Sequence, residues 1–207
     1  MTTKIEFTVK SSIFDRTRQL TIDPEYLEFD DNDLGSSLPV RFSKEEIEGI
    51  KYGVKGIRGY RFRIGRIYYI DIKSFSVEVI KIRLKSIYRI RIKRLEAKYG
   101  QILKVLFTYY FNEIARRYLE FFRAGESFEL LGVRFSADGV LFDEKIGLIP
   151  WEFLGTKKYW TYYALFSETN PEYYKAFNYV DQWNAAVLHS VTEGILKMKF
   201  PVRKSSQ

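Results

Sequence analysis

Basic side chains beside glycines are the first chemical signal in the chain. Residues 53–63 read GVKGIRGYRFR and hold three glycines and four basic residues. Glycine has no Cβ, so its backbone N–H group can approach an anion closely. Arginine adds paired N–H donors that match phosphate and carboxylate oxygens. The segment therefore predicts an anion-binding site that consists of Gly53, Lys55, Gly56, Arg58, Arg61 and Arg63.

A second basic segment, 81–95, reads KIRLKSIYRIRIKRL, with seven Lys or Arg residues and no acidic one. Basic and apolar residues alternate through most of it, and alternate residues of a strand share one face. The alternation is too long for one ordinary strand, which predicts a bend near 86–87. We expect one outward basic sheet face, which extends the anion-binding site through Lys81, Arg83, Lys85, Arg89, Arg91 and Lys93.

The net charge of +8 is unevenly distributed over the 207 residues. Residues 51–98 hold 15 Lys or Arg and three acidic residues, whereas the rest holds 19 basic and 23 acidic residues. Such asymmetry favours an anionic partner. The alternative is a solvated sheet face whose charges protect edge strands from aggregation.

Catalytic signatures are sparse. The chain has no cysteine and a single histidine, His189, which we expect at the surface or rim of a helix. It has no Gly-x-Ser-x-Gly motif and no phosphate-binding P-loop motif. Catalysis by two carboxylates stays open, because residues distant in sequence can meet in the fold. We expect a non-enzymatic protein that needs no cofactor and no metal.

The first residues contain no apolar core of a signal peptide, and no run of about 18 apolar residues predicts a transmembrane helix. The expected location is therefore the cytoplasm.

Hydrophobic periodicity predicts two series of strands, each followed by a helix. The first series covers 4–10, 20–22, 26–30, 47–54, 60–64, 66–73, 77–85 and 88–93, with a glycine-rich loop over 53–59. The second series covers 128–135, 140–142, 148–154 and 159–167, and 173–180 is either a further strand or the entry to a helix. Apolar residues at three- and four-residue spacing predict helices over 101–123 and 181–196, and 201–207 is a polar tail.

The two series resemble each other. Residues 20–30, LTIDPEYLEFD, align without a gap with 133–143, VRFSADGVLFD. Antiparallel strands closed by a C-terminal helix resemble the pleckstrin-homology (PH) superfold. The resemblance implies an α+β protein of two PH-like units, each a bent antiparallel sheet closed by a C-terminal helix. Their expected extents are 1–124 and 125–200, and the second unit is shorter, with five or six strands.

The resemblance also suggests a function. Many PH domains bind phosphoinositides through a Lys followed by Arg-x-Arg on the next strand, and Lys55 with Arg61-x-Arg63 is similar. We expect a scaffold that docks an acidic lipid headgroup or an acidic protein on its basic sheet face. Two alternatives remain: a homo-oligomeric or peptide-binding module without an anionic ligand, and a single-stranded nucleic-acid binder.

Overall fold

The chain folds into two compact α+β units, residues 1–111 and 112–207. The computed structural model describes residues 3–10, 16–30, 38–60, 62–88, 90–170 and 172–201, with the side chain of Arg63 outside that description. The boundary lies earlier than the expected 124, because the helical residues Asn112–Arg123 pack inside the second unit. Each unit is described by itself.

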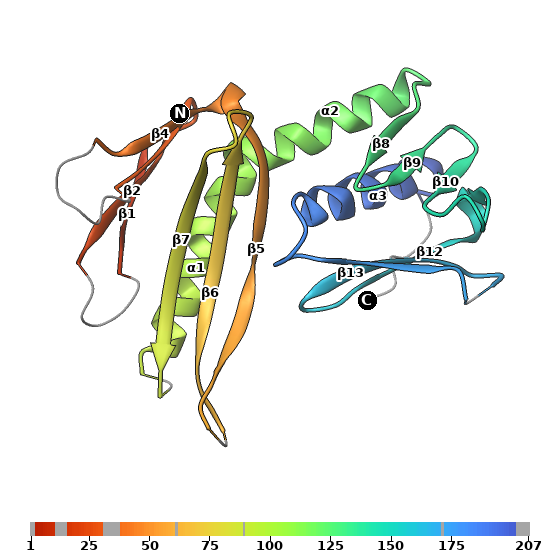
Figure 1. Cartoon of the computed structure of the whole chain (residues 1–207). Coiled ribbons are helices and arrows are strands. Elements are labelled where there is room, and N and C mark those ends of the chain that lie inside the picture. The colour runs from red at the N-terminus through yellow and green to blue at the C-terminus, as the bar shows by residue number, and fades with distance from the viewer. Residues whose placement is uncertain are drawn as a thin grey trace. The chain divides into compact units, whose positions relative to one another are not determined.

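Four antiparallel strands open the first unit (Figure 1). They are β1 (Ile5–Val9), β2 (Arg18–Ile22), β3 (Tyr26–Phe29) and β4 (Val40–Ser43), in that order across the sheet. Asp23 closes the β2–β3 turn. Its backbone N–H donates to the Tyr26 carbonyl over 2.9 Å, and its carboxylate accepts the Glu25 N–H over 3.0 Å. Aspartate suits this position because its short side chain reaches the backbone two residues ahead.

A 3₁₀ turn, η1 (Lys44–Glu46), leads into a second antiparallel sheet. Its strands are β5 (Ile47–Arg58), β6 (Arg63–Ser74) and β7 (Val79–Ile87). The expected glycine-rich loop is wrong, because Gly53 and Gly56 lie within β5, in register with Tyr69 and Arg66 of β6. Pairing with β6 provides hydrogen-bond partners for this part of the backbone and keeps it extended.

The chain leaves the sheet after Ile87 and enters a helix sooner than expected. Helix α1 (Ile92–Leu106) continues into a π-helical turn, η2 (Phe107–Phe111). Tyr88 and Arg91 have left-handed φ angles of 50° and 58°, which turn the chain out of the sheet. The predicted strand over 88–93 is therefore wrong, and Arg91 and Lys93 do not lie on the sheet face.

The core of the first unit lies between the sheets and the helix. Figure 1 shows α1 behind the β5–β7 sheet. Ile70 and Ile82 of the sheet and Ile102 of the helix are fully buried. The hydroxyl of Tyr110 in η2 donates to the carbonyls of Asp23 and Tyr26 at 2.5 and 2.7 Å. The end of the helical segment is thereby attached to the β2–β3 turn.

The described residues of the second unit form seven strands, where five or six were expected. A four-stranded sheet consists of β8 (Phe128–Leu130), β9 (Val133–Phe135), β10 (Gly139–Leu141) and β11 (Ile149–Pro150). A 3₁₀ turn, η3 (Trp151–Phe153), leads to β12 (Leu154–Lys158), β13 (Tyr162–Ser167) and β14 (Tyr174–Asn178). The predicted strand over 128–135 is a hairpin, because Leu131 and Gly132 take left-handed φ angles of 56° and 67°.

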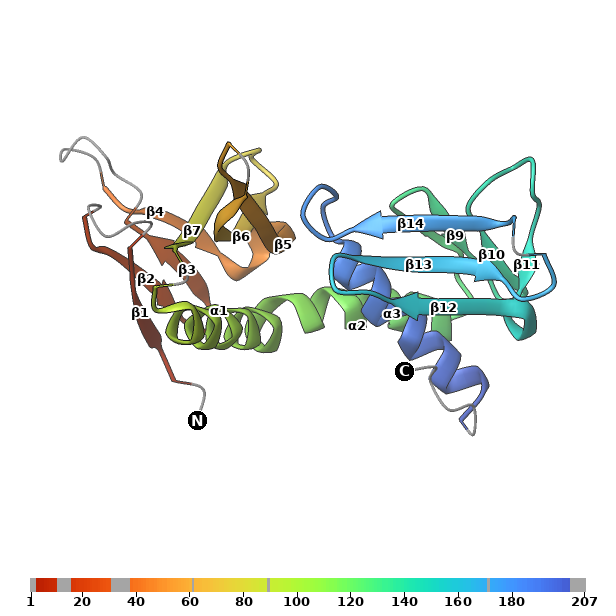
Figure 2. The ribbon, with the colours of Figure 1, turned by 90° about the horizontal axis from the view of Figure 1, so that it is seen from below.

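Two helices complete the second unit. Helix α2 (Asn112–Arg123) opens it and packs on α3 (Ala185–Lys199), and Figure 2 shows α3 behind the β12–β14 sheet. Gly194 permits the close approach of the two helices, because a Cβ there would lie 2.9 Å from the Leu119 side chain. Helix α3 begins later than the expected residue 181, since Asn184 takes a left-handed φ of 61° immediately before it.

From β1 in the first unit and from β8 in the second, the two units share one order of elements: four strands, a 3₁₀ turn, three strands and a 15-residue helix. The backbone hydrogen bond that closes the β2–β3 turn has its counterpart between Ser136 N–H and the Gly139 carbonyl. Both pairs occupy matching positions in the aligned segments 20–30 and 133–143.

The repeat extends to single side chains. Buried Ser74 at the end of β6 hydrogen bonds with Ser76 over 2.7 Å, and buried Ser167 at the end of β13 does so with Thr169 over 2.9 Å. In each unit the residue after the buried serine donates its N–H to the carbonyl of the last residue of the 3₁₀ turn. These bonds run from Phe75 to Glu46 and from Glu168 to Phe153. These shared details support the internal repeat beyond a general likeness of hairpins.

Candidate functional site

The outward side of the β5–β7 sheet carries a concentration of positive charge. On β7 the side chains of Ile80, Ile82 and Leu84 are buried, so the intervening residues point away from the core. The strand register continues this outward face across β6 and β5. We call it the basic face; its cations are Lys51, Lys55, Lys73, Lys81, Arg83 and Lys85.

Tyr69 lies at the middle of the basic face. It is in register with Gly53 of β5 and with Arg83 of β7. The Arg83 guanidinium carbon lies 4.5 Å from the centre of the Tyr69 ring, and the Lys55 ammonium lies 5.7 Å from it. Cations at these distances are attracted by the negative face of an aromatic ring. Tyr69 therefore fixes the position of two cations on different strands.

Arg83 is anchored more firmly than its neighbours. It forms an ion pair with Asp71 and donates to the carbonyls of Ile70 and Ile82 at 3.3 and 3.0 Å. Its side chain is only 23% exposed. Arg83 thus contributes mainly to the internal structure of the face.

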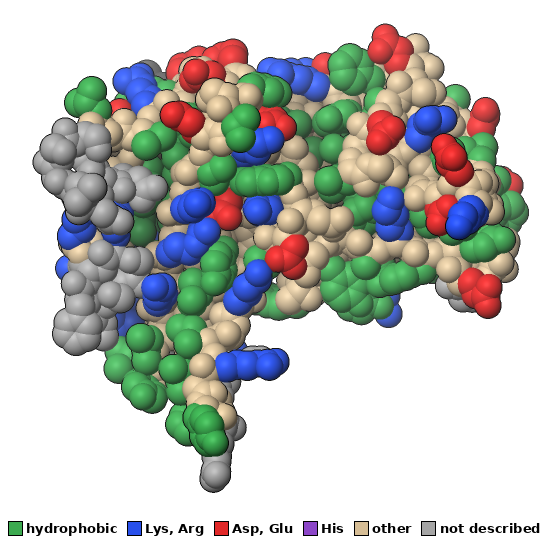
Figure 3. All heavy atoms as spheres, viewed as in Figure 1, with side chains coloured by type: hydrophobic (Ala, Val, Ile, Leu, Met, Phe, Trp, Pro, Cys, Tyr) green, Lys and Arg blue, Asp and Glu red, His purple; other side chains and the backbone are tan. Residues whose placement is uncertain are grey.

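The other cations of the basic face differ in their exposure. Lys73 pairs with Glu48 over 2.7 Å. Lys81 and Lys85 are exposed, and within the described residues neither is in an ion pair. Two carboxylates, of Asp71 and Glu48, thus face six cations. Figure 3 shows Lys and Arg side chains gathered over β5–β7. The excess positive charge makes the face complementary to an anionic surface.

The structure brings together only part of the predicted site. Gly53, Lys55, Gly56 and Arg58 lie on β5, and Lys81, Arg83 and Lys85 lie on β7. Arg63 begins β6, whereas Arg61 and Arg89 lie outside the described residues. Arg91 precedes α1, and Lys93 lies in its first turn.

Three residues of the basic face were not among the predicted site residues: Lys51, Tyr69 and Lys73. The alternation of side chains along β6 could have identified Tyr69 and Lys73, because alternate residues of a strand share one side and both lie on the outward side with Asp71. Their neighbours across the sheet depend on the strand register, which the sequence pattern does not specify.

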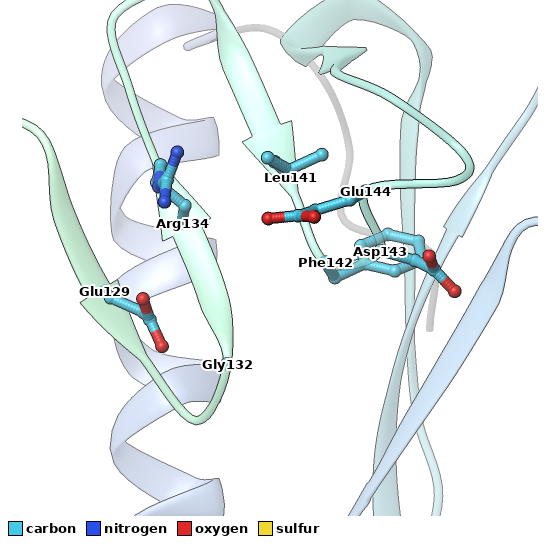
Figure 4. Close-up of a pocket in the computed structure, with 7 residues that line it drawn as sticks. All are labelled: Glu129, Gly132, Arg134, Leu141, Phe142, Asp143 and Glu144. Atoms are coloured by element: carbon cyan, nitrogen blue, oxygen red, sulfur yellow. The ribbon is translucent and has the colours of Figure 1, made fainter.

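A separate small pocket lies in the second unit. It encloses about 180 Å³ and is lined by Glu129, Gly132, Arg134, Leu141, Phe142, Asp143 and Glu144. Figure 4 shows Glu129 and Arg134 on neighbouring strands and the other two carboxylates on the loop after β10. The Lys175 ammonium donates to the carbonyls of Gly132 and Phe142 at 3.0 and 3.2 Å, which joins β14 to this region. In the described part of the chain, no group of three His, Cys, Asp or Glu residues is placed to hold a metal ion.

His189 belongs to the packing of α3 against β13. It is half-buried rather than at the surface, and its ring centre lies 4.6 Å from that of Tyr163. Burial lowers the pKa of His189 to about 4. The neighbouring Glu193 carboxylate accepts hydrogen bonds from Thr156 and Tyr163 at 2.9 and 3.4 Å. The imidazole is therefore neutral at physiological pH and packed on an aromatic ring.

Comparison with known proteins found no matching family model, no matching curated protein and no matching solved structure. Among the described residues, no helix is both long and apolar enough to cross a membrane.

Proposed function

We propose that this chain is a non-enzymatic binding or scaffold protein built from two PH-like units. The shared order of four strands, a 3₁₀ turn, three strands and a closing helix supports the PH-like interpretation. In this interpretation α1 closes the first unit and α3 closes the second, and α2 is an addition at the start of the second unit.

We further propose that an anionic partner docks on the basic face of the first unit. The observation that carries this proposal is the set of six cations on one side of β5–β7, around Tyr69 and against two carboxylates. Outward residues along one strand are about 7 Å apart, and β5 and β7 are about 10 Å apart. Such an array can meet several phosphate or carboxylate groups of one partner at once. Exposed cations at this spacing repel each other weakly, and a bound anion relieves that repulsion.

Charge reversal on β7 tests the proposal. In the variant Lys81→Glu with Lys85→Glu, two exposed cations become anions without any change in a buried side chain. We expect retention on heparin, and binding to phosphatidylserine vesicles, to weaken about tenfold or more. Binding of the parent should also fall steeply as salt rises from about 50 to about 200 mM.

The matched control is Lys157→Glu with Lys158→Glu, which makes the same charge change at two exposed lysines of β12. The control should bind like the parent. Equal losses in the two variants would mean that only net charge matters. Parent binding that is absent or insensitive to salt on every anionic material would refute the proposal.

A further inference from the structure

One end of the β5–β7 sheet exposes apolar side chains in a group. We call it the apolar end; its residues are Tyr60, Phe62, Ile87, Tyr88 and Ile90. Tyr60 is 96% exposed, Phe62 67% and Tyr88 69%. Figure 3 shows hydrophobic side chains gathered at the lower end of these strands, the end at which the β5–β6 hairpin and the end of β7 lie in Figure 1. Isolated exposed apolar residues are common, whereas a group of this kind indicates an interaction surface.

Backbone hydrogen bonds hold the apolar end together. The Gly59 N–H donates to the Phe62 carbonyl over 2.8 Å and closes the β5–β6 hairpin. The Tyr88 N–H donates to the Ile64 carbonyl over 2.7 Å, so the segment after β7 lies beside the start of β6. Residues from two separate segments therefore form one surface.

Two hydrogen bonds connect Ile90 to the end of β7. The Ile90 N–H donates to the Ile87 carbonyl over 3.1 Å, and the Ser86 hydroxyl donates to the Ile90 carbonyl over 3.0 Å. Tyr88 takes a left-handed φ of 50°, an uncommon conformation for a bulky residue. The side chains of Tyr88 and Ile90 are exposed to solvent, at 69% and 49%.

Positive charge surrounds the apolar end. Five basic residues adjoin it in the strands and in the first turn of α1, and all are exposed: Arg58, Lys85, Arg91, Lys93 and Arg94. The sequence from 79 to 95 contains no acidic residue. The first carboxylate after it, Glu96, is already paired with Arg66 over 2.9 Å. Within the described residues none of these five cations is in an ion pair, so the apolar group is combined with excess positive charge.

This combination matches the interface of a bilayer that contains anionic lipids. Tyrosine favours the headgroup level, where its ring is partly apolar and its hydroxyl meets water. Phenylalanine and isoleucine gain free energy by entering the boundary of the acyl chains. Lysine and arginine near the surface gain about 1 kcal/mol each from anionic headgroups. A protein partner would need an apolar pocket with acidic groups around it. A bilayer provides an apolar interior and anionic headgroups without requiring a specific shape.

We propose that the apolar end inserts into the interface of an anionic membrane surface, while the nearest cations of the basic face, Lys55 and Lys85, contact its headgroups. This inference rests on the proposed anion-docking function and names the partner of that site as a lipid surface. No helix has to cross the membrane for such binding.

Removal of exposed aromatic rings tests the inference. The variant Phe62→Ser with Tyr88→Ser should bind phosphatidylserine-containing phosphatidylcholine vesicles at least about tenfold more weakly than the parent. Its retention on heparin should be unchanged, because all the cations remain. Co-sedimentation with vesicles measures the first quantity, and a thermal melt checks that the fold is intact.

The opposite end of the same sheet provides a matched control. Phe75 and Val77, in the turn between β6 and β7, are 69% and 72% exposed, close to the values for Phe62 and Tyr88. They lie roughly 40 Å away along β6. The variant Phe75→Ser with Val77→Ser should bind vesicles like the parent. If it loses as much binding as the other variant, general hydrophobicity explains the effect and the inference is wrong.

Fluorescence provides a second, independent measurement. The indole introduced by Phe62→Trp should be quenched by brominated lipids, whereas the indole introduced by Phe75→Trp should not be quenched beyond the parent's own signal.

Three results would overturn membrane insertion while the proposed anion docking survives. The first is salt-sensitive heparin or single-stranded DNA binding without any vesicle binding. The second is unchanged vesicle binding by Phe62→Ser with Tyr88→Ser. The third is a parent dimer that this variant abolishes, which would make a second copy the occupant. In contrast, the absence of parent binding to any anionic material would refute the proposed function itself.

Discussion

The single histidine gives the stability of the protein a pH dependence that can be isolated. Burial lowers the pKa of His189 to about 4; Lys158 and Lys197 act in the same direction, and Glu193 opposes them. In the unfolded chain the imidazole pKa returns to about 6.5. Between these values the unfolded state binds more protons than the folded state. The free energy of unfolding therefore falls as the pH drops from 6.5 towards 4.

The size of the effect follows from the two pKa values. A shift of this extent corresponds to a loss of about 2 kcal/mol at about pH 5 relative to neutral pH. Because the ring is only half-buried, some hydration remains, and we expect about 1–2 kcal/mol. The variant His189→Gln cannot titrate. Between about pH 7.5 and about pH 5 the parent should therefore lose about 1–2 kcal/mol more unfolding free energy than His189→Gln loses.

Urea unfolding at the two pH values measures this difference. The carboxylates protonate in both proteins, so the comparison cancels most of their contribution. His189→Phe is the second control, since it keeps a ring against Tyr163 and should show the same pH dependence as His189→Gln. If the free energy of unfolding changed equally with pH in the parent and both variants, the reasoning would be refuted. The imidazole would then have the same pKa in the folded and unfolded chains.

Further predictions concern two glycines and one buried hydroxyl group. A Cβ at Gly65 would lie 2.2 Å from a backbone oxygen of β7, so Gly65→Ala should lower the unfolding free energy by more than about 1 kcal/mol in urea titration. A Cβ at Gly100 in α1 would meet open space, so Gly100→Ala should raise the free energy of unfolding by about 0.5–1 kcal/mol. If both alanine variants changed the free energy of unfolding in the same direction, the steric explanation would be wrong. Tyr110→Phe removes the donor that serves the carbonyls of Asp23 and Tyr26 and should cost about 1–3 kcal/mol in calorimetry, whereas a loss near zero would show that water replaces the hydroxyl.

The sequence predicted the faces of β7 because the period of a strand is local. Successive side chains point to opposite sides, so burial of Ile80, Ile82 and Leu84 requires Lys81 and Lys85 to face outward. This part of the prediction is confirmed. The likeness of 20–30 to 133–143 likewise corresponds to equivalent turns, because short-range turn chemistry is contained in the few residues that form the turn.

The sequence failed where two local structures suit one pattern. Alternating basic and apolar residues over 88–93 fit a strand, but they also fit a left-handed turn followed by the start of a helix. The choice depends on what the apolar side chains contact. The glycines of 53–56 posed the same problem, since only the pairing of β5 with β6 makes that segment a strand.

The charge, the alternation of strand faces and the internal repeat could thus be read from the sequence, because each follows from residue types and their spacing alone. Only the tertiary structure placed Tyr69 between Lys55 and Arg83, because cross-strand neighbours are set by register between segments far apart in sequence. The same holds for the apolar end, where a hydrogen bond from Tyr88 to Ile64 joins two segments that look unrelated in the sequence. Burial of His189 against Tyr163 also required the packing of a helix on a sheet, which no local pattern encodes.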